Sequence, residues 1–264
     1  MENLPQREPD RRKAGGIGAL VAAALAFLAK FKVALLLGFK LLAPAWTFVL
    51  SLWLYVLVFG WRFAVVIMLL LLAHELGHYA AFRAYGLPVR LPAFVPFLGA
   101  FTAGAPPDDL EHDAYIALAG PLTGLALAAA CYGIAVETGE RFWYACADVG
   151  AFLNLFNMIP MPPFDGGRVI AALQPALWFA GFALFVVAAV YLHIPLLFVA
   201  IIALLGLPAM LAAMRGHVDP RAARMTNAAR IRVGVWYLGT LFGLFYVMML
   251  SHGVASPRAA SVNW

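Results

Sequence analysis

The sequence predicts an all-α polytopic membrane protein with about six to seven transmembrane helices. Of its 264 residues, 64% are hydrophobic and 12% are charged. A soluble domain is nearer half apolar and a quarter charged. The mean hydropathy is +0.89. Because one span needs about 20 apolar residues, the chain has room for six or seven spans and for no separate soluble domain.

The apolar runs place these spans in order along the chain. Residues 1–14 are polar and predict a cytoplasmic tail without an evident cleavable signal peptide. Residues 15–40 are apolar but are interrupted by three lysines, which favours an interfacial helix or a shallow hairpin. The predicted spans are 41–60, 62–85, 114–136, 142–159, 169–192, 195–214 and 233–250.

The basic residues predict the orientation of the chain in a cell membrane. With the N-terminus inside, 15 of the 18 Lys and Arg residues fall on inside segments. The three outside are Arg62, Arg141 and Arg258. This bias predicts a cytoplasmic N-terminus. The net charge is +5, and the basic residues are scattered at the ends of the predicted spans. This distribution favours a role in membrane topology and in contact with the lipid bilayer, and it predicts no nucleic-acid partner.

The second predicted span carries a polar motif, His74-Glu75-Leu76-Gly77-His78. Histidines four residues apart lie on one face of a helix, where both imidazoles can bind one metal ion. Glu75 can reach a water on the same ion. Two nitrogen ligands and a carboxylate base are the arrangement of a zinc hydrolase.

A catalytic zinc site needs a third protein ligand, and the best candidate is Asp165. Pro160, Pro162 and Pro163 break the fourth span just before it. This places Asp165 at about the depth of His78, and an aspartate this deep is a functional candidate. The alternative is an exposed aspartate in an ordinary turn.

Three other groups have plainer interpretations. His112 lies beside acidic residues, where a lone histidine is more often solvated than a ligand. Cys131 and Cys146 lie in apolar runs and are expected to be packing residues.

Residues 86–107 are apolar but rich in proline and glycine, which excludes a regular helix. Such a segment can lie at membrane depth only where protein or a watery cavity satisfies its backbone. We expect a re-entrant loop or hairpin over the active site, with an edge that can pair with an extended substrate. The alternative is a hydrophobic loop in the interface.

Taken together, these motifs resemble the site-2 protease family of intramembrane zinc metalloproteases. The resemblance rests on the His-Glu-Leu-Gly-His motif, on Asn157-x-x-Pro160-x4-Asp165-Gly166, on Ala119-Gly120-Pro121-Leu122 and on Phe97-Leu98-Gly99-Ala100. It covers roughly residues 60–170. One departure concerns Gly124, where many relatives carry an asparagine, so that any role of that amide is missing or has moved.

The resemblance implies a site and a reaction. His74, His78 and Asp165 would hold one Zn²⁺ per chain, and Glu75 would be the general base. Asn157, and more weakly Asn154, would give hydrogen bonds to the substrate or its oxyanion. The chain would be one membrane-embedded peptidase domain, 1–264, with 1–40 as tail and interfacial segment, 60–170 as catalytic core and 171–264 as accessory helices.

The implied function is hydrolysis of peptide bonds in or near transmembrane segments of membrane protein substrates, with the active site towards the cytoplasmic side. One alternative is a membrane metal-ion binding protein or transporter, because polar residues within spans also mark ion paths. Another is a metalloprotease with a glutamate as third ligand. Only Glu137 and Glu140 follow at a span end, and both are predicted outside.

Overall fold

The computed structural model describes residues 25–32, 45–96, 99–217 and 219–255. The chain divides into two units, Met1–Trp46 and Thr47–Trp264. In the first unit, residues 25–32 are helical. The predicted tail 1–14 and most of the predicted interfacial segment 15–40 lie outside the described residues.

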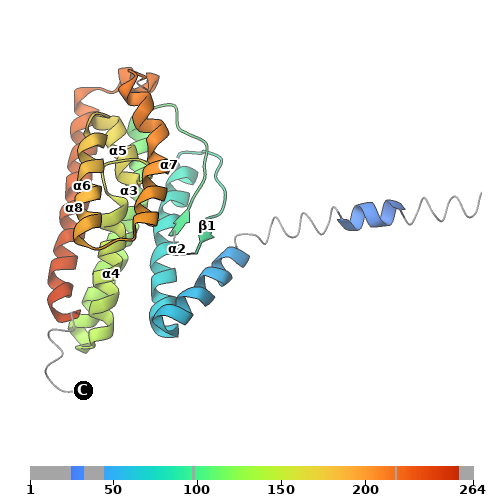
Figure 1. The fold of residues 1–264 in the computed structure, drawn as a ribbon, viewed down its shortest axis with the longest axis vertical. Coiled ribbons are helices and arrows are strands. Elements are labelled where there is room, and N and C mark those ends of the chain that lie inside the picture. Colours follow the sequence, from blue (N-terminus) through green and yellow to red (C-terminus); the bar gives the residue numbers. More distant parts are fainter. Residues whose placement is uncertain (1–24, 33–44, 97–98, 218, 256–264) are drawn as a thin grey trace, which may run out of the picture. The chain divides into compact units, whose positions relative to one another are not determined.

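The second unit is a helical bundle with one small hairpin (Figure 1). The helix Ala45–Phe59 leads into it. The further elements are α2 (Trp61–Ala84), β1 (Ala93–Val95), β2 (Gly99–Phe101), α3 (Leu110–Thr138), α4 (Arg141–Asn157), α5 (Asp165–Leu173), α6 (Leu177–Tyr191), α7 (Leu196–Met214), the 3₁₀ helix η1 (Pro220–Arg224) and α8 (Asn227–Ala255).

Helix α3 lies at the centre of this bundle. It packs against α2, α4, α5 and α8, and α4 also packs along α8. The largest buried cluster joins side chains of α3 and α8, including Leu118 and Leu244. The ends of α3 follow from its sequence: the Asp109 carboxylate accepts a hydrogen bond from the His112 N–H at 2.8 Å, and Gly139 closes the helix in the left-handed conformation.

The apolar helices confirm an α-helical membrane protein. Within the described residues, α2, α3, α7 and α8 are long and apolar enough to cross a membrane. The helix Ala45–Phe59 and α6 are apolar but shorter. The predicted number of six to seven spans stays a prediction.

The predicted continuous span 169–192 is wrong. The structure has two helices there, because α5 ends at Leu173 and α6 begins at Leu177. Pro175 lies between them and cannot donate the backbone hydrogen bond that a continuing helix needs.

The proline- and glycine-rich segment contains an antiparallel hairpin. β1 pairs with β2, with Phe94 opposite Ala100, and Val89 forms a further bridge to Gly104. The Phe94 N–H donates to the Thr47 Oγ1 at 3.3 Å, and the Phe94 ring is buried against Phe48. The hairpin lies beside α2 (Figure 1). Its depth in a membrane stays a prediction.

Candidate metal centre and active site

Helix α2 presents three buried polar side chains to the interior of the bundle. His74, Glu75 and His78 are only 4–5% exposed. One helical turn separates the two histidines, and their Nε2 atoms lie 3.1 Å apart. The sequence spacing therefore produces the expected pair of imidazoles on one face.

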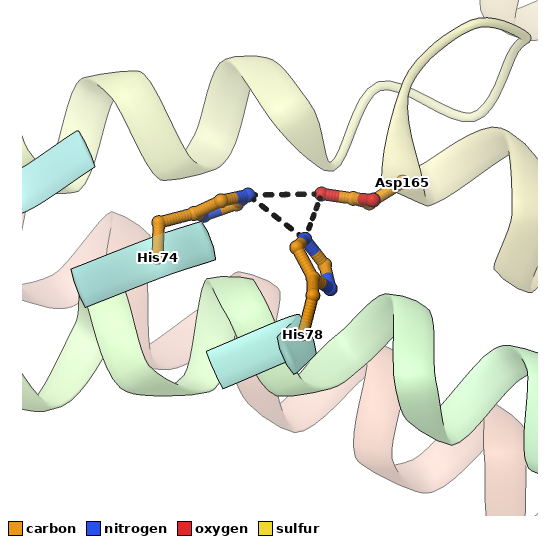
Figure 2. A group of neighbouring side chains, drawn as sticks. All are labelled: His74, His78 and Asp165. Carbon is orange, nitrogen blue, oxygen red and sulfur yellow. Dashed lines mark hydrogen bonds and ion pairs between the residues drawn. The ribbon is translucent and has the colours of Figure 1, made fainter. Parts of the chain in front are cut away.

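Asp165 completes a triangle of potential ligand atoms with these two histidines. It is the first residue of α5, and its Oδ2 lies 3.1 Å from the Nε2 of His74 and 3.1 Å from the Nε2 of His78. Figure 2 shows the three side chains pointing toward one common point. Within the described residues, this is the group of His, Cys, Asp and Glu side chains that could hold a metal ion.

The hydrogen bonds of the two rings show why this group fits a cation. The His78 Nδ1 lies 2.7 Å from the Ile116 carbonyl oxygen, which can only accept, so this nitrogen carries the proton. The His74 Nδ1 lies 2.7 Å from the Asn154 Oδ1 and donates in the same way. Both Nε2 lone pairs then face each other and a carboxylate. A bound metal ion relieves this mutual repulsion, so the donor set fits a divalent cation.

Glu75 is adjacent to this triangle, and one of its two carboxylate oxygens has no protein partner among the described residues. Its Oε2 is buried and has no hydrogen-bond partner among the described residues. A buried, unpartnered carboxylate oxygen is costly, and native proteins keep such a group mainly where a ligand, water or function requires it. The backbone carbonyl of Glu75 accepts a hydrogen bond from the Thr102 Oγ1 at 3.1 Å, which ties the hairpin segment to this turn of α2.

Two glycines allow α2 and α3 to approach closely at the site. A Cβ atom at Gly77 would overlap the Ala119 carbonyl, and a Cβ atom at Gly120 would overlap the His78 ring. The fourth position of the His-Glu-Leu-Gly-His motif and the glycine of the Ala-Gly-Pro-Leu motif are thus both required by packing. The spacing of these two motifs along the chain does not indicate that they lie against each other.

The turn that precedes Asp165, residues 158–164, is held by helices that lie later in the sequence. The Tyr237 hydroxyl of α8 donates to the Met158 carbonyl at 2.7 Å. A Cβ atom at Gly181 of α6 would overlap Pro160, and one at Gly206 of α7 would overlap the Pro162 carbonyl. Helices α6, α7 and α8 therefore all contact the turn directly.

A chain of ion pairs continues from the aspartate to the loop before α8. The Arg168 Nη1 lies 4.0 Å from the Asp165 Oδ1, and its Nη2 bonds Asp113 at 2.5 Å. Arg221 bonds Asp113 at 3.3 Å and Asp219 at 2.7 Å. The Arg221 guanidinium holds the pKa of the Asp219 carboxyl below its usual range through these hydrogen bonds. Sequence analysis did not single out this network, because its members come from three separate segments.

An apolar cavity of about 460 Å³ opens onto His74 and Glu75. Its walls come from the helix Ala45–Phe59, α2, α4, α7 and the strand β2, and they include Phe63, Phe156 and Ile202. Asn157 is a polar residue in this wall. An apolar pocket with a few convergent polar groups is the usual form of a binding site.

The remaining predicted residues lie elsewhere. His112 pairs with Asp109 at 2.6 Å and contacts the Tyr85 ring, away from the metal centre. Glu137 and Glu140 are exposed near the far end of α3. The structure therefore brings Asp165, and neither glutamate, to the histidines.

Asn154 is buried and bonds His74, whereas Asn157 faces the cavity. Cys131 and Cys146 are buried as free thiols, as expected of packing residues.

Fold and site together define an α-helical membrane protein with a largely buried cluster of two histidines and one aspartate that could hold a metal ion. Residues 62–140 of the chain match the model of peptidase family M50, the site-2 protease family. The resemblance that the motifs indicated is thus confirmed.

Named relatives are similar to part of the chain. "Putative zinc metalloprotease Rip3" of Mycobacterium tuberculosis is 36% identical over 118 residues, which is 41% of this chain and 30% of the relative. "Putative zinc metalloprotease MJ0611" of Methanocaldococcus jannaschii is 38% identical over 26% of this chain and 38% of its own length. "Zinc metalloprotease MJ0392" of the same organism is 29% identical over 38% of this chain and 30% of its own length. The chain thus spans less than two fifths of the length of each of these relatives.

Proposed function

We propose that this protein is an intramembrane zinc metallopeptidase that hydrolyses peptide bonds in or near transmembrane segments of other membrane proteins. The observation that carries the proposal is the buried Glu75 carboxylate, which lines an apolar cavity beside three convergent potential ligand atoms and whose Oε2 has no partner among the described residues. The family match and the names of the relatives support zinc as the metal.

His74, His78 and Asp165 would hold the zinc ion. When bound, zinc supplies a Lewis acid for the scissile carbonyl and lowers the pKa of a water molecule to about 7. The Glu75 carboxylate then accepts a proton from the attacking water. The same group later donates that proton to the leaving amine nitrogen.

The cavity supports a substrate that is apolar and extended near the bond to be cut. The aromatic and aliphatic walls of the cavity would exclude water from the substrate on either side of the bond to be cut. Strand β2 supplies backbone groups to the cavity wall. An extended peptide can add to such an edge as a further strand. Asn157 in the cavity wall would donate a hydrogen bond to the substrate or its oxyanion. A protein with one transmembrane segment, locally unwound, meets these requirements.

The charge bias of the loops supports the orientation. We infer a multi-pass protein of the cell membrane with a cytoplasmic N-terminus and an active site towards the cytoplasmic side. On this interpretation the chain is one peptidase domain, in which residues 60–170 form the catalytic core.

Metal binding without hydrolysis is the competing function, and Glu75 separates the two. A storage or transport site has no use for a buried base that binds no metal. The experiment is to express the wild type and the Glu75→Gln variant at equal levels and to compare the membrane proteomes. Single-span proteins that accumulate uncut only with Glu75→Gln support the proposal, and identical proteomes count against it.

A further inference from the structure

Asn154 differs from Asn157 in what its side chain contacts. It lies on α4, three residues before Asn157, and is 2% exposed. The Asn154 Nδ2 donates to the Gly150 carbonyl at 2.8 Å, and its Oδ1 lies 2.7 Å from the His74 Nδ1. Because a carbonyl can only accept, the bond to Gly150 fixes which end of the amide faces His74.

This contact determines the tautomer of one metal ligand. An acceptor opposite Nδ1 keeps the proton on that nitrogen and leaves the Nε2 lone pair free for the metal ion. In His78 the proton is kept on Nδ1 in the same way by a backbone acceptor, the Ile116 carbonyl oxygen at 2.7 Å. His74 alone depends on a side chain from another helix.

The space for this side chain comes from Gly124 of α3. A Cβ atom at Gly124 would overlap the Oδ1, Cγ and Nδ2 atoms of Asn154. Gly133, nine residues further along the same helix, has nothing within 4 Å of such a Cβ atom. The absence of a side chain at Gly124 of α3 therefore leaves the space that the Asn154 carboxamide occupies.

We propose that Asn154 is a positioning residue that fixes the tautomer and the orientation of His74, and that Gly124 forms one unit with it by making room for its amide. The inference rests on zinc binding at the proposed site.

The test is the zinc affinity of the purified full chain, measured by competition with a chromophoric chelator, alongside its thermal stability in the same detergent. Removing a partner of a ligating histidine typically weakens metal affinity by about 10–100-fold. We expect a loss of this size for Asn154→Leu, which keeps the volume but has no acceptor. Asn154→Asp keeps the acceptor and is expected to stay within about 5-fold of the wild type.

Two further variants separate positioning from packing. Thr240→Ala removes another hydrogen bond from a buried side chain to a helix carbonyl, that of Trp236 on α8, and should leave zinc affinity unchanged. Gly124→Ala should weaken zinc about 10-fold or more in the wild type, but less than about 3-fold when added to Asn154→Ala, because the methyl group then has room.

Equal zinc affinity of Asn154→Leu and the wild type would overturn the positioning role, as would equal losses in Asn154→Leu and Asn154→Asp. Additive effects of Gly124→Ala and Asn154→Ala would overturn the pairing of these two residues. None of these measurements involves cleavage. A chain that binds zinc but cuts no substrate would therefore contradict the proposed function and leave this test intact.

Discussion

The two halves of the candidate metal centre are built in different ways. The histidine half consists of His74 and His78 on the uninterrupted helix α2, which packs tightly against α3. The aspartate half consists of the non-helical turn 158–164 and Asp165, which α6, α7 and α8 hold in place. Helix geometry alone brings the first pair together. The second half depends on contacts with residues up to about 80 positions away in sequence.

This difference separates two kinds of sensitivity. Both halves offer potential ligand atoms, so the loss of such an atom from either half should have a similar chemical effect. The histidine half is preorganised by one helix and should tolerate changes in α6 to α8. The aspartate half should respond to every contact that supports its turn.

The largest expected effect is loss of a ligand from either half. His78→Ala and Asp165→Ala should each weaken zinc binding by more than about 100-fold, which exceeds the effect of removing a supporting partner. Metal analysis of the purified variants measures this loss. Asp165→Ala with a wild-type zinc content would show that the aspartate half holds no metal.

A change at the contact of α2 with α3 should disturb the histidine half next. The Cβ atom of Gly120→Ala would overlap the His78 ring, and overpacking of a filled interior costs about 1–3 kcal/mol. We expect a lower melting temperature together with weaker zinc binding. Gly133→Ala on the same helix is the control and should change neither property. Identical behaviour of the two variants would mean that this close approach is not needed.

The matching change in the aspartate half is Gly206→Ala on α7. Its Cβ atom would overlap the Pro162 carbonyl and press on the turn before Asp165. We expect zinc affinity to fall less than in Gly120→Ala, because α7 is a less extensively packed helix that can shift outward. Gly234→Ala on α8 meets nothing within 4 Å and serves as the control. A larger loss than in Gly120→Ala would reverse this ranking.

The smallest expected effect comes from one hydrogen bond to the turn. Tyr237→Phe removes the donor to the Met158 carbonyl and should lower the free energy of unfolding by about 1 kcal/mol. Tyr246→Phe, at a tyrosine that is 49% exposed, is the matched control. Thermal melts of both variants in one detergent give the comparison. Equal melting temperatures would show that the bond does not stabilise the turn.

The sequence predicted the histidine half almost completely. The i, i+4 spacing identifies the shared face, and the apolar run identifies the helix. Asp165 could be proposed from its depth and the prolines before it, but its 3.1 Å approach to both histidines depends on tertiary packing. The partners of the rings were out of reach for the same reason: Ile116 acts through its backbone, and Asn154 acts from another helix.

The single wrong span shows the same limit for the fold. Residues 169–192 are apolar enough for one helix, yet α5 and α6 are separate. The composition shows only how long the apolar segment is. Pro175 and the contact of Gly181 with Pro160 decide where the chain turns. Apolar content predicts that a segment is buried or in lipid, and it does not predict how many helices the segment forms.

The most direct test of the proposed peptidase measures zinc content and cleavage on one sample of Glu75→Gln. The purified variant and the wild type would each be assayed for bound zinc and then incubated in micelles with a single-span protein found uncut in vivo. The proposal predicts equal zinc in both and at least about a 100-fold loss of cleavage in the variant, as expected when a general base is removed. Cleavage at the wild-type rate by zinc-loaded Glu75→Gln would contradict it.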